Sequence, residues 1–220
     1  MANDIKDQID AIFFDLDGTL MDTDDQAVER VARWLQRLHW PRPQRAARRL
    51  VMAVETPGNF LVTMLDVVGL DRLAMAFAGR LRHRLGRRMH DFRLMAGARE
   101  MLIDLSSRYR MAIVSTRAEA ETKAFLDQHD LHDFFELLVT CESTWRLKPH
   151  PAPILHAAQQ MGVAVERCAM VGDTTVDVKS ARRAGAWAIA VLCGFGGRAE
   201  LERAGALWIL EHTSHLTSLL

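Results

Sequence analysis

Short apolar runs alternate with longer amphipathic segments along much of the chain, and each apolar run stops at a polar turn. The first run, residues 9–14, ends at the charged turn 15–19. Similar runs follow at residues 111–114, 168–171 and 187–192, and residues 207–210 could add a last one. Short apolar runs bounded by turn residues are typical of buried strands in a parallel sheet.

The segments between these runs have helical character. Residues 97–107 place Met101, Leu102 and Leu105 on one face, and residues 118–129 and 152–161 also read as helices. Strands that alternate with helices indicate an α/β fold with a doubly wound parallel sheet. Residues 212–220 would add a short closing segment.

Residues 22–91 break this alternation. The segment lacks β-branched runs and predicts helices at 24–38, 44–54, 60–68 and 71–89, separated by proline and glycine. We therefore expect residues 22–91 to form an all-helical cap domain inserted after the first strand. Residues 1–21 and 92–220 would form the α/β core.

Polar residues follow the predicted strands at their carboxyl ends, where open α/β sheets bind ligands. Asp15 and Asp17 follow the first strand, and Asp173 with Asp177 follows the run 168–171. Two further residues complete the set, Ser115 after the run 111–114 and Lys148 before the helix 152–161. Carboxylates and one lysine at a common edge predict a site for a hard cation and an anion together.

The residue types suit phosphate chemistry at a metal ion. Nearby carboxylates repel each other and an anionic substrate, and Mg²⁺, which prefers oxygen ligands, relieves this repulsion. Lys148 would supply a fixed positive charge for a phosphoryl group. Gly18 would permit a tight turn and close approach of the backbone to the anion. Ser115 and the N–H groups that open the next helix would form an anion cradle.

In order and spacing, four motifs resemble those of the haloacid-dehalogenase-like hydrolases. They are Asp15-Leu16-Asp17-Gly18-Thr19-Leu20, Ser115-Thr116-Arg117, Lys148-Pro149 and Val171-Gly172-Asp173-Thr174-Thr175-Val176-Asp177. Lys148-Pro149-His150-Pro151 and Ala181-Arg182-Arg183-Ala184-Gly185 look like the phosphoglycolate-phosphatase branch, which carries a helical cap after the first motif.

The resemblance implies the catalytic roles. Asp15 would be the nucleophile that forms an aspartyl-phosphate. Asp17 would protonate the leaving oxygen and then activate water, while its backbone carbonyl binds Mg²⁺. Lys148 would bridge Asp15 and the phosphoryl group. Dehalogenases proper lack an acid at the position of Asp17, so its presence favours phosphate chemistry.

The resemblance also implies the binding roles. Asp15, Asp17, Asp173 and Asp177 would form the metal site, with Asp177 as a supporting carboxylate. Ser115 would hold a phosphoryl oxygen. The family usually has asparagine after that serine, whereas this chain has Thr116 followed by Arg117. Arg117 could replace part of the missing contact with a cation.

Composition narrows the class of protein. There are 28 basic and 28 acidic residues, and the pI is about 7.1, which argues against a nucleic-acid binder. The longest apolar run has eight residues, 186–193, too short to span a bilayer. The three cysteines lie far apart and the first residues show no secretory signal, so we expect a cytoplasmic protein.

The predicted activity is Mg²⁺-dependent hydrolysis of a small phosphomonoester metabolite. A phosphomutase on the same scaffold and a non-catalytic binding or regulatory protein are the alternatives. Phosphonate cleavage would require a lysine in the cap, and residues 22–91 contain none. The substrate and the oligomeric state stay open.

Overall fold

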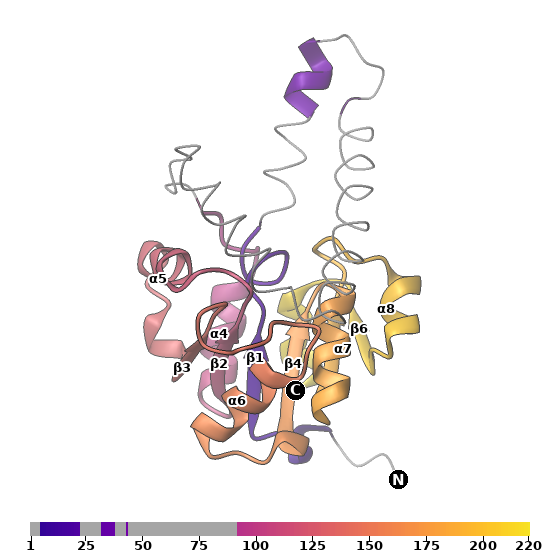
Figure 1. The fold of residues 1–220 in the computed structure, drawn as a ribbon. Helices are drawn as coiled ribbons and strands as arrows, with labels where there is room; N and C mark the ends of the chain where they lie inside the picture. The colour runs from indigo at the N-terminus through magenta and orange to yellow at the C-terminus, as the bar shows by residue number, and fades with distance from the viewer. Residues whose placement is uncertain (1–4, 23–31, 38–42, 44–91) are drawn as a thin grey trace.

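The computed structural model describes residues 5–22, 32–37, 43 and 92–220, and this part is built around a parallel sheet (Figure 1). Its strand order is β3-β2-β1-β4-β5-β6. The strands are β1 (Ala11–Phe14), β2 (Arg110–Val114), β3 (Leu137–Val139), β4 (Cys168–Gly172), β5 (Trp187–Val191) and β6 (Trp208–Leu210).

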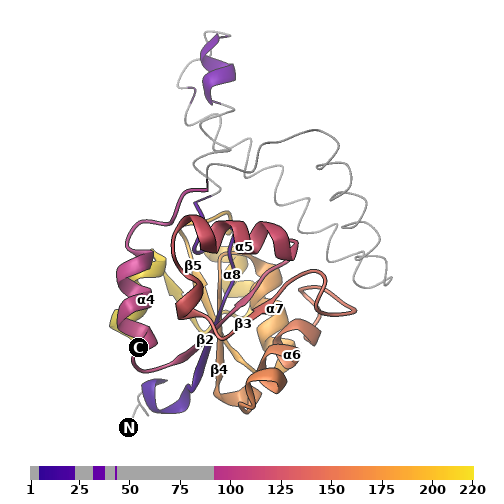
Figure 2. The ribbon, with the colours of Figure 1, turned by 90° about the vertical axis from the view of Figure 1, so that its left-hand side faces the viewer.

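Helices connect the strands and cover both faces of the sheet. Figure 2 shows α4 on one side and α6 and α7 on the other. The α-helices are α4 (Ala98–Ser106), α5 (Glu119–Gln128), α6 (Ala152–Met161), α7 (Thr175–Ala184), α8 (Arg198–Ala204) and α9 (Leu216–Leu219). The 3₁₀ turns are η1 (Ile5–Gln8), η2 (His132–Phe134), η3 (Val165–Arg167) and η4 (Thr213–His215).

Successive residues of a buried strand feed two separate cores, because side chains alternate between the faces of a sheet. Ile12 and Phe14 of β1 pack in one core with residues of α4, α5 and α9. Ala11 and Phe13 pack in the other with residues of α6, α7 and α8. Since both faces are covered, β1 and β4 have no polar side chains and β2 has only Arg110 at its exposed start, which explains their apolar runs.

Strands are added to the sheet first on one side of β1 and then on the other. From β1 the chain moves outward through β2 and β3, and then crosses back to β4 on the other side of β1. The ladder continues one residue beyond the strands, since the Asp15 N–H donates to the Val171 carbonyl at 2.9 Å and the Ser115 N–H to the Val139 carbonyl at 2.9 Å. The carboxyl ends of β1, β2 and β4 therefore hold their polar residues at one edge.

The predicted doubly wound sheet is confirmed, including the final strand. Strand β3 and helix α8 were not predicted. Most of the predicted cap domain, residues 22–91, lies outside the described residues; residues 32–37 are helical and fall within the expected helix 24–38. Across the described ranges, none of the helices has the length and apolarity needed to cross a bilayer.

Candidate active site

The turn after β1 is shaped by its own backbone. The Leu16 carbonyl accepts hydrogen bonds from the N–H groups of Leu20 at 3.0 Å and Met21 at 2.8 Å. Gly18 has a φ of +69°, which favours glycine, and its N–H donates to the Met21 carbonyl at 2.9 Å. A Cβ on Gly18 would lie 2.3 Å from Oδ2 of Asp173. The glycine therefore closes the turn and makes room for a carboxylate, and its N–H is already engaged within the turn.

Lys148 is buried at the centre of the site, and three acceptors surround its ammonium group. Nζ donates to Oδ1 of Asp15 at 2.8 Å, to Oδ1 of Asp177 at 2.6 Å and to the Val114 carbonyl at 2.8 Å. An ammonium group has three protons, so every donor is used. This arrangement fixes the ammonium between the first strand and α7.

Helix α7 positions both Asp177 and the loop that carries Lys148. Oδ2 of Asp177 accepts hydrogen bonds from the Thr174 N–H at 3.1 Å and hydroxyl at 2.6 Å, which caps the helix start and leaves Oδ1 for Lys148. One turn later, the Ser180 hydroxyl donates to the His150 carbonyl at 2.8 Å. One helix thus orients an acid and its lysine partner.

Asp173 is completely buried beneath a glycine-rich loop that follows β5. Its Oδ2 accepts a hydrogen bond from the Phe195 N–H at 2.8 Å. A Cβ on Gly194 would lie 2.1 Å from the same oxygen, and a Cβ on Gly196 would lie 2.0 Å from the Asp173 carbonyl oxygen. The loop can approach Asp173 only because these positions have no side chain.

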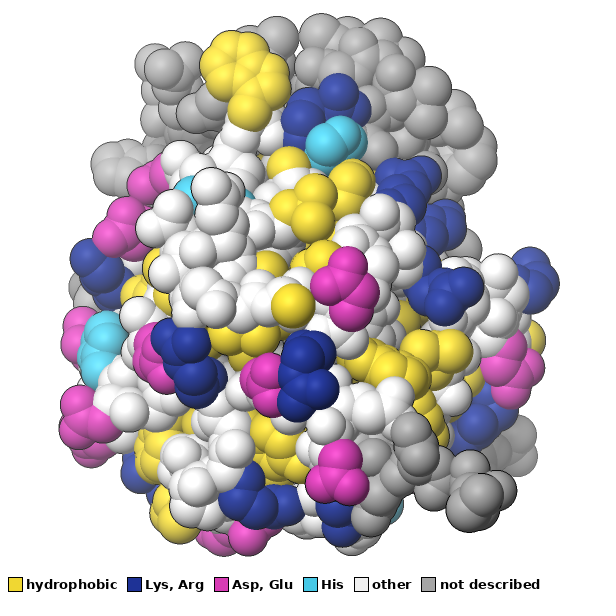
Figure 3. All heavy atoms as spheres, turned by 90° about the horizontal axis from the view of Figure 1, so that it is seen from below, with side chains coloured by type: hydrophobic (Ala, Val, Ile, Leu, Met, Phe, Trp, Pro, Cys, Tyr) yellow, Lys and Arg dark blue, Asp and Glu magenta, His cyan; other side chains and the backbone are white. Residues whose placement is uncertain are grey.

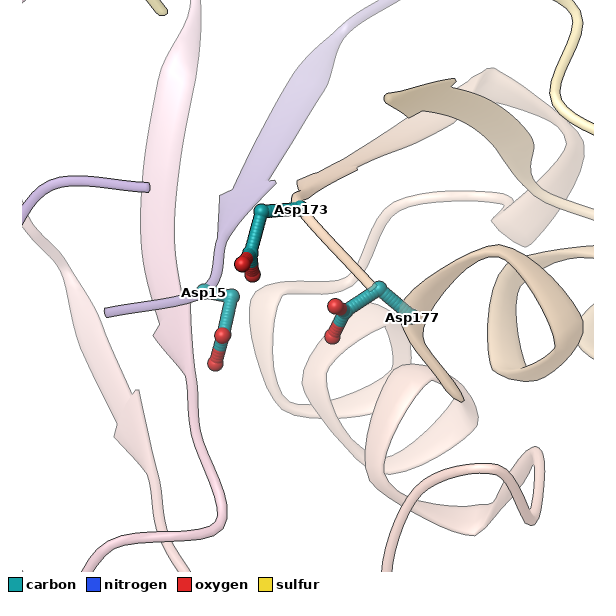
Figure 4. Close-up of side chains that lie close together, drawn as sticks. All are labelled: Asp15, Asp173 and Asp177. Carbon is teal, nitrogen blue, oxygen red and sulfur yellow. The ribbon is translucent and has the colours of Figure 1, made fainter. Parts of the chain in front are cut away.

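Three carboxylates converge in this site (Figure 4). Asp15, Asp173 and Asp177 each offer an oxygen, and these oxygens lie within 4.8 Å of one another. With Lys148 among them, the three acids would leave an excess of two negative charges when all are ionised. Burial raises the pKa of Asp15 to about 7, and Lys148 offsets this only in part. Clustered hard oxygen donors with this excess charge fit a divalent cation such as Mg²⁺.

Asp17 faces a different partner. Arg117 holds its carboxylate with two hydrogen bonds, from Nε to Oδ2 and from Nη2 to Oδ1, both 2.6 Å long. Nη1 of Arg117 also donates to Glu121 at 3.0 Å. The Arg117 N–H donates to the buried Ser115 hydroxyl at 3.2 Å, so the loop after β2 links the serine to Asp17.

The family described as haloacid dehalogenase-like hydrolase matches residues 12–191. This span contains the four aspartates, Ser115, Arg117 and Lys148, and it ends before the glycine-rich loop that covers Asp173. The chain belongs to this family. The fold is shared with solved structures: a hydrolase from Pseudomonas syringae is 27% identical, with a TM-score of 0.68 over 96% of this chain and 97% of that one.

Two curated relatives are similar along most of their length. A protein named phosphoglycolate phosphatase from Nitrosococcus oceani is 30% identical and covers 80% of this chain, with 81% of its own length matched. A protein named pyrophosphatase PpaX from Bacillus cereus is 27% identical over 97% of both chains. These relatives are named for phosphate-releasing hydrolysis, and this family member is likewise a hydrolase.

The structure brings most of the sequence-predicted residues to one edge of the sheet. Asp15, Lys148, Asp173 and Asp177 lie in direct contact or close proximity. The Asp17 side chain stands outside the three-carboxylate cluster and is paired with Arg117 instead. Thr116 is half-buried in the turn between β2 and α5.

Sequence reasoning missed several supporting groups. The Phe195 N–H and the close packing of Gly194 and Gly196 on Asp173 were not foreseen, although three glycines within residues 194–197 were an available signal. The role of Glu121 was also missed. Its spacing of four residues from Arg117 is the one that allows ion pairs on a helix.

Proposed function

We propose that this protein is a Mg²⁺-dependent phosphatase that hydrolyses a small phosphomonoester metabolite through an aspartyl-phosphate on Asp15. The observation that carries the proposal is the position of Asp15: its carboxylate meets the Lys148 ammonium at 2.8 Å and shares a site with Asp173 and Asp177. The names of the two curated relatives support phosphate release as the reaction.

In the first step, an Asp15 oxygen forms a bond to phosphorus while the bond from phosphorus to the ester oxygen breaks. Asp17 gives its proton to the departing oxygen. In the second step, water attacks the phosphorus of the aspartyl-phosphate, Asp17 takes a proton from that water, and inorganic phosphate leaves with Asp15 regenerated. The same side chain thus serves as acid and then as base, and no proton is gained or lost over the cycle.

The remaining residues stabilise charge. Lys148 neutralises negative charge on Asp15 and on the transferred group. Asp15, Asp173, Asp177 and the Asp17 backbone carbonyl would hold Mg²⁺, which when bound would neutralise the phosphoryl oxygens and bring the anionic substrate close to the carboxylates. The Ser115 hydroxyl accepts from the Arg117 N–H, and its own proton remains for a phosphoryl oxygen.

We also propose the domain division expected from the sequence, with a core of residues 1–21 and 92–220 and a helical cap of residues 22–91. In this arrangement the cap would select the substrate, and the core would carry the chemistry. The proposal for the core does not depend on the cap, because every side chain assigned above comes from the core.

The test is a screen of phosphorylated metabolites with Mg²⁺, run in parallel on the wild type and Asp15→Asn. Asparagine preserves the shape of the side chain and removes the nucleophilic oxygen, so turnover should fall to background while the far-UV spectrum stays unchanged. Removing Mg²⁺ with EDTA should abolish turnover in the wild type. Near-wild-type, Mg²⁺-dependent turnover in Asp15→Asn would refute the proposal.

The same screen separates the alternatives. A phosphomutase would accumulate a bisphosphate intermediate rather than inorganic phosphate. A binding protein without activity would neither release phosphate nor bind beryllofluoride, an analogue of the phosphorylated aspartate.

A further inference from the structure

The Arg117 guanidinium connects two carboxylates in a chain. Asp17 accepts hydrogen bonds on both of its oxygens at 2.6 Å, and Glu121 accepts one at 3.0 Å on the other side of the guanidinium. All three side chains are largely shielded, with 21–30% exposed. Paired N–H groups fix the plane of a carboxylate as well as its distance. The orientation of Asp17 is therefore set by Arg117.

Arg117 is itself held at several points. Its N–H donates to the Ser115 hydroxyl at 3.2 Å, and its carbonyl accepts from the Cys141 N–H at 3.0 Å. Glu121, in the first turn of α5, holds the far side of the guanidinium. Burial opposes the charge on Arg117, but the two carboxylates outweigh this effect and raise its pKa, so the cation persists.

We propose that Arg117 and Glu121 are positioning residues for Asp17: Glu121 fixes the guanidinium, and the guanidinium fixes the carboxylate that exchanges protons during turnover. The inference rests on the proposed function, which gives Asp17 its role. Arg117 directly follows Thr116, which stands where the family usually has asparagine. In this proposal its role is to orient Asp17. Neither residue needs to touch the substrate.

The competing explanation is that these ion pairs only stabilise the fold. Arg110 and Glu136 provide a matched control, because Arg110 also grips a carboxylate with several hydrogen bonds, at 2.6–3.0 Å. That pair joins the starts of β2 and β3, at the edge opposite the site. Arg110→Met should leave kcat unchanged, because its carboxylate has no part in the chemistry.

The experiment is a double-mutant cycle on kcat, measured with an alkyl and an aryl phosphate. Arg117→Met should lower kcat for the alkyl phosphate by about 10- to 100-fold, which is below or at the lower limit of the range of about 10²–10⁴ that a complete acid–base group supplies. The loss should be smaller for the aryl phosphate, whose leaving group needs less protonation. KM should change little. Glu121→Gln should show the same pattern with a smaller loss, about 3- to 10-fold.

The decisive comparison uses Asp17→Asn as the background. If Arg117 acts through Asp17, adding Arg117→Met to Asp17→Asn should produce almost no further loss, because the group being positioned is already gone. Arg117→Lys should recover part of the activity, since one ammonium can hold one carboxylate oxygen but not orient both.

Two outcomes would overturn the inference. If the losses from Arg117→Met and Asp17→Asn multiply and KM rises, Arg117 contacts the substrate directly. If Arg117→Met and Glu121→Gln lower only the melting temperature, the pairs are structural. Should Arg117→Met fail to fold, the same double-mutant cycle with Asp17→Asn can be measured with the nearly isosteric Glu121→Gln. Failure of the proposed function looks different, because Asp15→Asn would then keep its activity.

Discussion

The two ends of strands β1 and β4 carry similar charged residues in opposite environments. At the amino ends, Asp10 and Arg167 form a bidentate ion pair, and each side chain is 45% exposed. At the carboxyl ends, Asp15 and Asp173 are buried beside Asp177 and Lys148. The amino end balances one acid with one base in contact with water. The carboxyl end packs three acids around one base away from water.

The pKa values of the two aspartates that flank β1 are shifted in opposite directions. The hydrogen bonds from Arg167 lower the pKa of Asp10, whereas burial raises the pKa of Asp15 to about 7. In Figure 3, which views the molecule from below, some basic side chains lie directly beside acidic ones. We infer that the uncompensated charge at the carboxyl end is kept for binding a cation and a phosphoryl group, at a cost in stability.

The largest effect should come from removing the buried cation. Lys148→Met would leave Asp15 and Asp177 facing each other without the ammonium group, and breaking a buried ion pair costs about 3–5 kcal/mol. Urea denaturation in EDTA measures this loss, and turnover should vanish. Mg²⁺ should restore part of the stability. Lys123→Met is the control, because Lys123 forms an exposed pair with Glu119 and should change neither quantity. Unchanged stability in Lys148→Met would mean that the carboxylates do not depend on the lysine.

The next effect tests the packing above Asp173. In Gly194→Ala, a methyl group 2.1 Å from Oδ2 of Asp173 must displace the loop or the carboxylate, and overpacking of this kind costs about 1–3 kcal/mol. Mg²⁺ should then stabilise the protein against unfolding less than in the wild type. Gly197→Ala, three residues further along, meets its nearest atoms only at 3.9 Å and should behave like the wild type. Equal Mg²⁺ responses in the two variants would contradict the packing role.

The sequence predicted the central sheet because burial on both faces leaves a strong pattern there. Strand β1 has four fully buried residues in a row, so its apolar run clearly predicts a buried strand. Strand β3 lies at the edge, has three residues and buries only Val139. Helix α8 is short and buries only Leu201. Both escaped prediction, whereas β6, which is equally short and has no fully buried residue, was expected from the apolar run 207–210.

The site, too, has one part that the sequence predicts and another that it does not. Topology alone brings Asp15 and Asp173 together, since neighbouring parallel strands end at one edge, and a motif in the sequence is enough to predict it. The pairing of Asp17 with Arg117 spans 100 residues and depends on side-chain conformation, which no sequence spacing specifies. The hydrogen bond from the Phe195 N–H to Asp173 leaves no signal in the sequence either, because every residue type except proline has a backbone N–H.

A pH titration should sharpen the contrast between the two ends. Because the pKa of Asp15 is raised to about 7 in the folded protein from 3.8, the folded state holds a proton that the unfolded state has lost. Without metal, this contribution to stability is complete below about pH 4 and is lost as the pH rises through 7. One proton limits the slope to about 1.4 kcal/mol per pH unit. Denaturation of the wild type and Asp15→Asn in EDTA isolates the contribution, because all other groups are shared. If the unfolding free energies of the two proteins changed with pH in the same way, Asp15 would make no such contribution.

The smallest effect is expected at the amino end. Arg167→Met removes the partner of Asp10 at an exposed position, where water replaces the lost hydrogen bonds and salt screens the charge. We expect no resolvable change in unfolding free energy, in turnover or in the response to Mg²⁺. The same removal of a cation is severe at Lys148 because water cannot reach Asp15 and Asp177 to compensate. A loss in Arg167→Met comparable to that in Lys148→Met would show that burial is not what separates the two ends of these strands.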